Sequence, residues 1–402
     1  MNSEQPKQSI WSPLKLPLYR AIWIGICLSN LGYWMQTTTA SWLMKEWSNE
    51  DPLLVSLVQT SYFLPTVVLI VFAGTLADIF NRKTLLILAN IWMMASAALL
   101  AIIIYQGSTN PLILLLLSAL LAIGFALNQP TQSAIVPEIV GIKNIGPAVS
   151  LYSIANNGAR VLGPAIAGIL VPIVSGAAVI AINAVSYLVL LGVLFSWKRT
   201  SRPPQKKTTK FFQLLLEGFH FAARSRPFRT LLIRGGLFFG VTSIILAMMP
   251  MLVKDVEQYG FIFGCFGLGA IVGAVNYANL SHKFSRNKIV TMSILIHAIA
   301  LILLGMVNSA VLMSAILLIA GIAWFFVMSA LQISAQLILP DEMRGRGIAI
   351  LNMILMSGYA IGSPIWGTTA LLTNPPLSMI IAGTTSLLFL LATQHMIFPK
   401  DQ

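Results

Sequence analysis

Charged residues are scarce in this sequence. Only 9% of its 402 residues are Asp, Glu, Lys or Arg, whereas 57% are hydrophobic. Soluble domains carry about 25% charged residues, so this chain has too few polar side chains to cover a surface that faces water. The composition therefore excludes an ordinary soluble globular protein.

Cysteine and strand-like alternation are also lacking. The two cysteines, Cys27 and Cys265, both lie within apolar runs and indicate neither a disulfide framework nor a zinc site. A membrane barrel needs alternating strands of about 10 residues, and runs such as "LILLLLSALLAIGFAL" do not alternate. Many apolar stretches instead approach the ~20 residues that a bilayer helix requires. We therefore predict an all-α polytopic membrane protein.

Motifs for enzymatic chemistry are absent as well. The sequence has no nucleotide-binding loop of the Gly-x4-Gly-Lys-Ser/Thr type, and no cluster that indicates hydrolytic or metal catalysis. An ATP-driven pump would need a separate partner chain. We therefore predict a protein that is not an enzyme and that needs no cofactor and no metal ion.

Twelve membrane spans can be drawn along the chain. One break between them, residues 198–228, is long, basic and rich in proline, with "FFQLLLEGFHFAAR" as a short amphipathic helix. The predicted parts are thus an N-terminal six-helix bundle (1–197), a basic linker (198–228) and a C-terminal six-helix bundle (229–402). The predicted spans are 19–44, 53–77, 84–105, 110–134, 147–172, 176–197, 229–253, 258–280, 288–307, 310–338, 347–372 and 376–397.

The basic residues indicate how these spans cross the membrane. Of the 25 Lys and Arg, Arg160 and Arg234 lie inside spans, and Lys45 and Lys254 lie at span ends. The others lie at the N-terminus, in or beside the even-numbered loops, or at the C-terminus. The positive-inside rule then places both termini in the cytoplasm of a multi-pass protein of the cell (inner) membrane. We interpret the net charge of +13 as this topology signal and expect no nucleic-acid partner.

The two halves of the chain repeat one another. Arg20 and Lys45 correspond to Arg229 and Lys254 at a shift of 209 positions, and "GTLADIFNR" corresponds to "ANLSHKFSR" at a shift of 204. Each half enters from the same side, so the repeat is parallel. Two pseudo-symmetric six-helix bundles around a central path are typical of alternating-access transporters, whereas a receptor or a scaffold has no need of such a duplication.

The stretch "GTLADIFNRK" (74–83) resembles the signature loop of the major facilitator superfamily. Gly74, Asp78, Arg82 and Lys83 fill matching positions, but the basic residue that commonly precedes the basic pair is missing. The resemblance implies a conformational latch, in which Asp78 accepts from a helix N-terminus or pairs with an arginine. An ordinary turn with a charged cap is the alternative.

The stretch "NNGARVLGPAIAG" (156–168) resembles the fifth-helix motif of exporters in this superfamily. Gly158, Gly163, Pro164 and Gly168 match in kind. Small residues let helices pack closely and proline permits a bend, so the resemblance implies export, with simple tight packing as the alternative. With "PTQSAIVPEIVG" and "LPDEMRGRGIAI", the chain is similar to the branch that includes the enterobactin exporter and the macrolide-efflux-like permeases.

Polar side chains at lipid depth are candidate substrate contacts. Asn156 and Arg160 are four residues apart and share a helix face, and Gln129 and Gln132 share another. The aromatic residues Tyr33, Trp34, Trp324, Phe325 and Phe326 add apolar contact surface. The predicted substrate-binding residues are Arg160, Asn156, Asn30, Gln36, Gln129, Gln132, Gln332, Gln336 and Trp34.

Arg160 is the central candidate among them. Arginine stays charged in proteins, so a mid-membrane arginine must face a cavity or a partner rich in carbonyl groups. It is either a fixed cation for an anionic substrate or a structural residue bonded to backbone, Asn and Gln. The repeat favours the substrate, because Tyr359 stands at the corresponding position. Arg234 lies near its helix start and is expected to reach back to the interface.

Carboxylates are missing from the middle third of every span, although many proton-driven drug exporters carry one there. The resemblance implies proton coupling, for which Glu46, Asp78 and His297 are the candidate carriers. A lone histidine such as His297 can titrate near neutral pH, but it is more often packed and neutral.

The sequence therefore predicts a secondary transporter that exports a small organic molecule by alternating access. By resemblance this molecule is a siderophore or a drug-like amphiphile, and Arg160 and the amides favour an anionic siderophore. The other expected partners are protons and membrane lipids. A lysophospholipid flippase, a non-transporting receptor or scaffold, and an importer are alternatives that the sequence leaves open.

Overall fold

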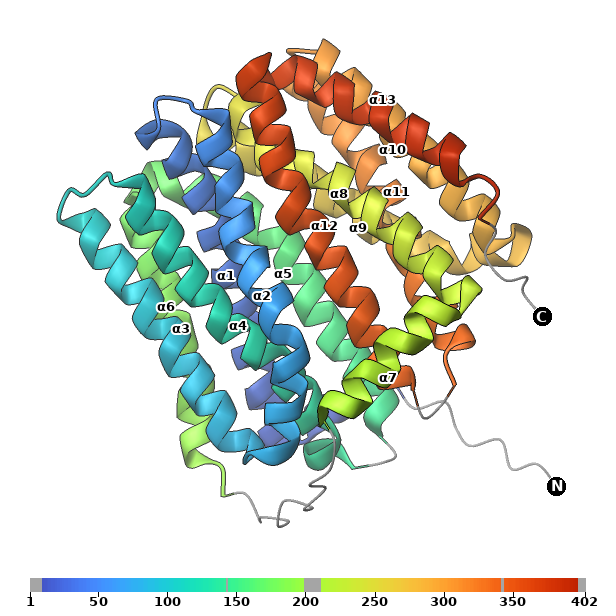
Figure 1. Ribbon diagram of the computed structural model, residues 1–402. Coiled ribbons are helices and arrows are strands. Elements are labelled where there is room, and N and C mark those ends of the chain that lie inside the picture. The colour runs from blue at the N-terminus through green and yellow to red at the C-terminus, as the bar shows by residue number, and fades with distance from the viewer. Residues whose placement is uncertain (1–8, 142–143, 199–210, 341–342, 397–402) are drawn as a thin grey trace.

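The computed structural model describes residues 9–141, 144–198, 211–340 and 343–396; for 70–71, 74–75, 77–79 and 211–216 it describes the backbone only. These ranges form one short 3-10 helix and thirteen α-helices, with no strand among them. Figure 1 shows the first-half helices in blue and green on the left, and the second-half helices in yellow to red on the right. The fold is thus the predicted helical fold in two six-helix halves.

The helices follow the predicted order along the chain. Eleven helices, α2 to α6 and α8 to α13, are long and apolar enough to cross a membrane; α1 is equally long but carries a polar run at 36–41. The first half consists of η1 (Ser12–Lys15), α1 (Pro17–Trp47), α2 (Pro52–Ile79), α3 (Arg82–Tyr105), α4 (Pro111–Val140), α5 (Ile145–Val174) and α6 (Gly176–Ser196). The remainder consists of α7 (Phe211–Arg224), α8 (Arg226–Leu252), α9 (Val256–Lys283), α10 (Arg286–Met306), α11 (Ala310–Ile338), α12 (Arg344–Leu372) and α13 (Pro375–Thr393).

Local sequence signals set the helix ends. Asp51 and Asn110 precede a proline at the first helical position, and each side chain accepts a hydrogen bond from the first turn of its helix. The fourth span was predicted to end at residue 134, but α4 continues through Pro137 to Val140 and is followed by Gly141, whose φ is 72°. Glycine adopts this left-handed backbone readily. The predicted span stopped after the polar stretch "NQPTQSA" (128–134), whereas the helix continues through "IVPEIV" (135–140).

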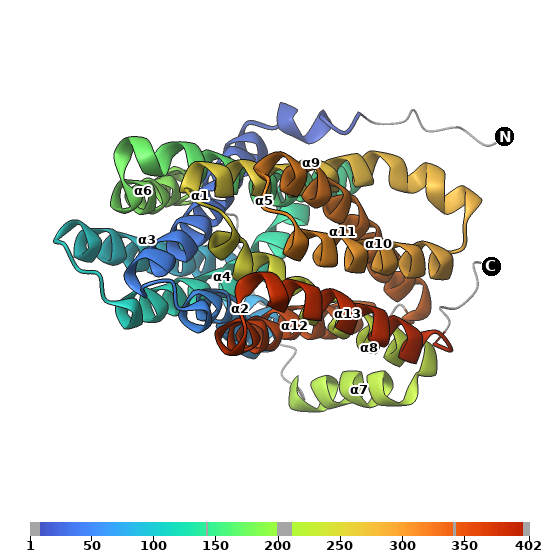
Figure 2. The same cartoon turned by 90° about the horizontal axis from the view of Figure 1, so that it is seen from above.

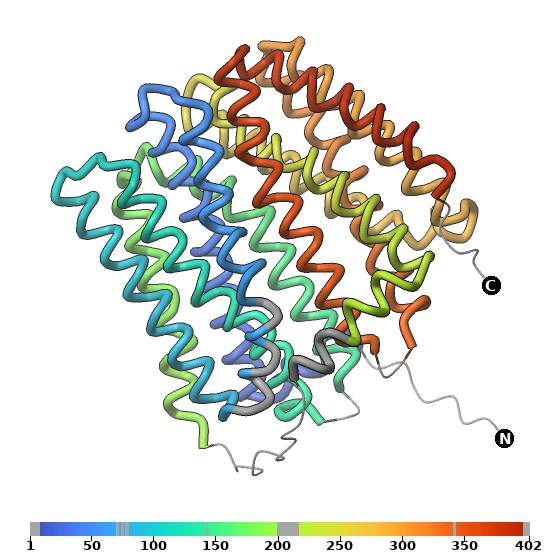
Figure 3. Tube along the Cα trace, in the orientation of Figure 1, coloured from blue at the N-terminus to red at the C-terminus, as the bar shows by residue number. Residues whose placement is uncertain are grey.

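The packing of the helices repeats between the halves. In the first half α1 packs against α5 and α6, and α2 packs against α4; in the second half α8 packs against α12 and α13, and α9 packs against α11. Two equivalent pairs join the halves, α2 with α12 and α5 with α9 (Figure 3). This arrangement is the two-fold relation that the internal repeat predicts.

Glycines permit the closest approach between the halves. A methyl group on Gly168 of α5 would lie 2.6 Å from the Cα atom of Gly260 on α9. At the equivalent place, a methyl group on Gly367 of α12 would collide with Ser56 of α2. Backbones in contact leave no room for larger side chains. Both contacts lie toward the far end of the bundle, which we define as the end where α1 ends and α2 begins.

Helix α7 lies beside the bundle against α8 and α12 (Figure 2). Glu217 accepts a hydrogen bond from Arg346 of α12 at 3.2 Å, and Gly218 lies against Ile350 of the same helix. The predicted short helix "FFQLLLEGFHFAAR" is therefore present, and its second half is attached to the second bundle. The predicted part boundaries at 197/198 and 228/229 stay a prediction.

Candidate functional site

The central cavity lies between the two halves. Helices α1, α2 and α5 line it from the first half, and α8, α9, α11 and α12 from the second. It holds about 580 Å³ of atom-free space, its opening included. The wall is mostly aromatic and aliphatic, which is usual for small-molecule sites. The lining residues are Trp34, Phe63, Arg160, Phe239, Thr242, Ile245, Leu246, Phe263, Phe266, Trp324, Met328, Leu355, Met356 and Tyr359.

Arg160 is the charged residue of this wall. Its guanidinium carbon lies 4.9 Å from the ring centre of Trp34 and 5.4 Å from that of Trp324. The Nε atom is buried without a hydrogen-bond partner, and none of the described acidic side chains forms an ion pair with the group. Cation–π contacts compensate a buried charge only in part. Arg160 thus presents an unsatisfied cation to the cavity.

Two hydroxyl groups supply the other polar surface of the cavity. Thr242 Oγ1 is buried and has no hydrogen-bond partner. The hydroxyl of Tyr359 accepts a hydrogen bond from Trp324 Nε1 at 3.1 Å, so its own proton is available to an acceptor. The Tyr359 ring stacks on Phe63 of the other half at 4.7 Å between centres. The cavity therefore offers one cation and two hydroxyls within an apolar wall.

Three of the predicted substrate-binding amides contact one another instead of the cavity. Asn156 Oδ1 accepts hydrogen bonds from Asn30 at 2.9 Å and from Gln129 at 3.1 Å. Asn156 in turn donates to the Tyr152 carbonyl, and the Tyr152 hydroxyl donates to Gln129 at 2.7 Å. The network ties α1, α4 and α5 together one turn from Arg160. Its polar groups are largely satisfied within the protein, which favours a supporting role.

The other predicted amides lie away from the cavity wall. Gln36 accepts a hydrogen bond from Asn183 at 2.6 Å inside the first half, and Gln132 is buried without partners for either amide atom. Gln332 donates to Asn352 at 2.8 Å, and Gln336 is exposed. Of the nine predicted contacts, only Arg160 and Trp34 line the cavity.

Several lining residues were missed because they are apolar or weakly polar. Phe239, Thr242 and Tyr359 give no signal in a search for polar side chains at lipid depth. Trp324 was expected to contribute apolar surface and lines the cavity, whereas Tyr33 stacks on Phe125 within the first half at 4.1 Å. The repeat held a usable signal, since Tyr359 corresponds to Arg160 and both face the cavity.

Comparison with known proteins is consistent with this architecture. The family model described as "Transmembrane secretion effector" matches residues 8–402. The chain belongs to this family of major facilitator transporters. This transporter is 25% identical to the enterobactin exporter EntS of Escherichia coli, over 80% of its own chain and 80% of the relative. Over 92% of its chain and 88% of the relative it is 22% identical to the multidrug efflux pump Tap of Mycolicibacterium fortuitum.

Further relatives and solved structures agree with this assignment. The staphyloferrin A transporter of Staphylococcus aureus is 23% identical over 80% of the transporter and 82% of the relative. The nucleoside transporter NupG has a TM-score of 0.76 at 14% identity, covering 95% and 98% of the two chains. The inward-open xylose transporter XylE of Escherichia coli has a TM-score of 0.72 at 16% identity, covering 96% and 97%. The structural likenesses support the fold alone.

The basic pair of the signature loop contacts the first half of the transporter. Arg82 donates to Glu138 and to the Ala134 carbonyl at the end of α4, each at 2.9 Å. Lys83 donates to the Trp197 carbonyl that follows α6. The side chains at 74 and 78 lie outside the described residues, so the predicted latch of Gly74 and Asp78 stays a prediction.

The fifth-helix motif of the transporter makes contacts in two directions. Gly163 packs against Trp34 of α1 in its own half, while Pro164 and Gly168 meet Gly260 of α9 in the other half. Gly158 faces open space, and a methyl group there would meet no atom within 4 Å. Close packing therefore explains Gly163 and Gly168 but not Gly158.

The candidate proton carriers of the transporter lie outside the cavity wall. Glu46 is exposed at the far end and accepts from Trp42 Nε1 at 2.7 Å. His297 is fully buried, with its ring 5.0 Å from that of Phe238 and with no partner for either ring nitrogen. The Asp78 side chain lies outside the described residues. Proton coupling thus stays a prediction.

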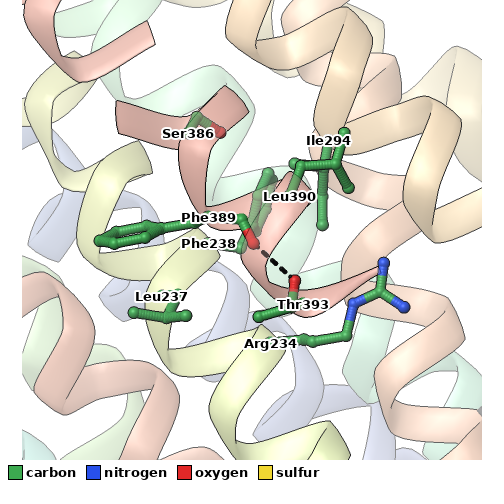
Figure 4. Close-up of a pocket in the computed structure, with 8 residues that line it drawn as sticks. All are labelled: Arg234, Leu237, Phe238, Ile294, Ser386, Phe389, Leu390 and Thr393. Carbon is green, nitrogen blue, oxygen red and sulfur yellow. Dashed lines mark hydrogen bonds between the residues drawn. The ribbon is translucent and has the colours of Figure 1, made fainter. Parts of the chain in front are cut away.

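A second, much smaller cavity of the transporter lies inside the second half between α8, α10 and α13 (Figure 4), with about 250 Å³ of atom-free space, its opening included. Arg234 lies at its edge and is only 3% exposed. Its guanidinium donates to Asn287 at 2.7 Å, to Thr291 at 3.1 Å and to the Met396 carbonyl at 3.1 Å. Three neutral acceptors thus hold the side chain inside the bundle, with Asn287 at the start of α10 and Met396 after the end of α13. The expected reach to the membrane interface stays a prediction.

Proposed function

We propose that this transporter exports a small organic molecule across the cytoplasmic membrane by alternating access, with both termini in the cytoplasm. Membership in the secretion effector family supports membrane transport. The repeated halves and the cavity between them are the parts that alternating access requires. The glycine motif of α5, which resembles that of exporters, supports the outward direction.

Arg160 carries the proposal for the substrate. A permanent cation between two indoles, in an otherwise apolar cavity, suits an amphiphile with an anionic group. Relatives include an enterobactin exporter, a staphyloferrin A transporter and a multidrug pump. We therefore propose a siderophore or a drug-like amphiphile as the cargo. Arg160 and Trp34 are the two residues of the predicted set that bind it.

The contacts between the halves support a rocking motion. The backbones of Gly168 and Gly260 touch toward the far end, and Lys45 donates to the Val253 carbonyl there at 2.8 Å. Release of these contacts would open the cavity at the far end. The resemblance to major facilitator exporters supports proton coupling, with Glu46, Asp78 and His297 as the candidate carriers.

Export assays in cells test this function. A deletion strain grown under iron limitation should retain more siderophore, or should be more sensitive to amphiphilic drugs, than the parent strain. The wild-type chain should restore export, and Arg160→Gln should not. Lys254→Gln removes an exposed cation at a span end and is the matched control. Normal export in the deletion strain contradicts the proposed cargo, and lysophospholipid flipping in liposomes would favour the lipid alternative.

A further inference from the structure

The charge in the central cavity is permanent. Arginine does not deprotonate in proteins, and Arg160 faces two indole rings and no described carboxylate. The lining residues include no Asp, Glu or His that could neutralise the site by gaining or losing a proton. Any change in the charge of the cavity therefore has to come from what the cavity binds.

Alternating access closes this cavity twice in each cycle. On the outward step, an anionic cargo pairs with Arg160 while the cavity is sealed from water. On the return step the cargo has left, and closure would bury the arginine without a counter-charge. An unpaired buried charge is strongly unfavourable, so an empty cavity is a poor state in which to return.

We propose that a small inorganic anion binds Arg160 on the return step, so that the transporter exchanges its cargo for this anion. The inference rests on the proposed export of an anionic cargo, and it makes an anion the companion ion in place of the proton. An inorganic anion enters as the organic anion leaves. The charge of Arg160 is then paired with an anion on both the outward and the return step. Chloride and inorganic phosphate are the two anions that fit this description.

The cavity has further groups that suit such an ion. Thr242 lines the same cavity as Arg160 and is 2% exposed. Its Oγ1 atom has no hydrogen-bond partner. Its hydroxyl can donate, as can that of Tyr359, which already accepts from Trp324. Hydrogen bonds from hydroxyl groups to a charged acceptor are stronger than those to neutral ones. The cavity therefore presents one cation and two hydroxyl donors, and each of these groups can bind a small anion.

An exchange assay tests the proposal without knowledge of the cargo. The purified full chain is placed in phosphatidylethanolamine–phosphatidylglycerol liposomes, loaded with radiolabelled phosphate or radiolabelled chloride. Release of the label is measured into medium that contains only a bulky buffer anion, and after addition of phosphate or chloride. The added anion that the site accepts should speed release about 10-fold.

Three variants connect this exchange with the cavity. Arg160→Gln should reduce release to that of protein-free liposomes, and Thr242→Val should raise the half-saturating anion concentration about tenfold. Lys254→Gln should leave both unchanged. Thermal unfolding of each variant checks that it folds, and Thr242→Val supplies the test if Arg160→Gln does not fold.

The outcomes separate this inference from the proposed function. Release that ignores external anions, or that persists at the wild-type rate in Arg160→Gln, overturns anion exchange. If the same chain still exports its cargo in cells, and a pH gradient drives that export, only the inference fails. If neither export nor exchange occurs, the proposed function fails as well.

Discussion

Replacing Lys45 with methionine is expected to loosen the far end of the molecule. Lys45 belongs to α1, yet its ammonium donates at 2.8 Å to the carbonyl of Val253, the residue that caps α8 in the other half. The same group lies 4.7 Å from the Trp42 ring centre, and the residue is 7% exposed. Methionine keeps most of the side-chain volume but removes the charge and the donor.

The size of the effect follows from these contacts. A hydrogen bond from a charged donor contributes about 1.5–3 kcal/mol, and the partly buried cation–π contact adds about 0.5–1 kcal/mol. Glu50 at 3.7 Å adds little, because its side chain is 69% exposed. Water solvates the ammonium once the halves separate, which offsets part of this sum. A net loss of about 2 kcal/mol shifts the equilibrium roughly 30-fold toward the state open at the far end.

Spin labels on Gln106→Cys and Asn308→Cys, two positions exposed at the far end, measure this shift. Cys27 and Cys265 are first replaced by serine so that only the two introduced cysteines react with the label. In Lys45→Met, double electron–electron resonance should show a larger population at the longer distance between the two labels and a smaller population at the shorter one. Lys254→Met removes the repeat-related but exposed lysine and should change nothing. Identical distance distributions for Lys45→Met and the parent would refute the reasoning.

The remaining predictions concern packing and buried polar groups. Gly168→Val should also favour the open far end, since overpacking against Gly260 costs about 1–3 kcal/mol; an unshifted distance between the same spin labels contradicts this. Tyr19→Phe should lower stability by about 1 kcal/mol, because the buried hydroxyl donates to the Ala148 carbonyl at 2.9 Å. Tyr277→Phe, which removes a hydroxyl without a partner, should leave the melting temperature unchanged or raise it. Arg234→Met should reduce the free energy of unfolding most, by about 3 kcal/mol or more, because three acceptors lose their donor. Its melting temperature should therefore fall furthest, and a wild-type melting curve would show that these bonds contribute nothing.

Much of the fold could be read from the sequence because bilayer helices are defined by composition. Each span needs a long apolar run, and the repeat predicted the equivalence of α1 to α6 with α8 to α13. The end of α4 was predicted too early, since the helix continues past Pro137 to Val140, with Gly141 as its cap. Hydropathy marks where the apolar stretch ends, whereas the positive φ of a glycine marks where the helix ends.

The candidate site could be read only in part. Arg160 was identifiable because its charge has few acceptable environments at lipid depth. Gln36 and Asn156 were placed in the substrate path on the same ground, but amides also form hydrogen bonds with each other across helices, as these two do with Asn183 and Asn30. Phe239 and Phe266 could not be recognised, because side chains of their kind line a cavity and fill a core equally well.

The two indoles beside Arg160 give the protein an optical property of its own. Indole emission responds to nearby charge, and the guanidinium lies within 5.4 Å of both ring centres. An anion that pairs with Arg160 changes the electric field at Trp34 and Trp324 together. In variants that keep only Trp34 or only Trp324 of the nine tryptophans, the emission reports occupancy of the cavity without any added label. The same signal would rank unlabelled compounds by affinity before a transport assay exists.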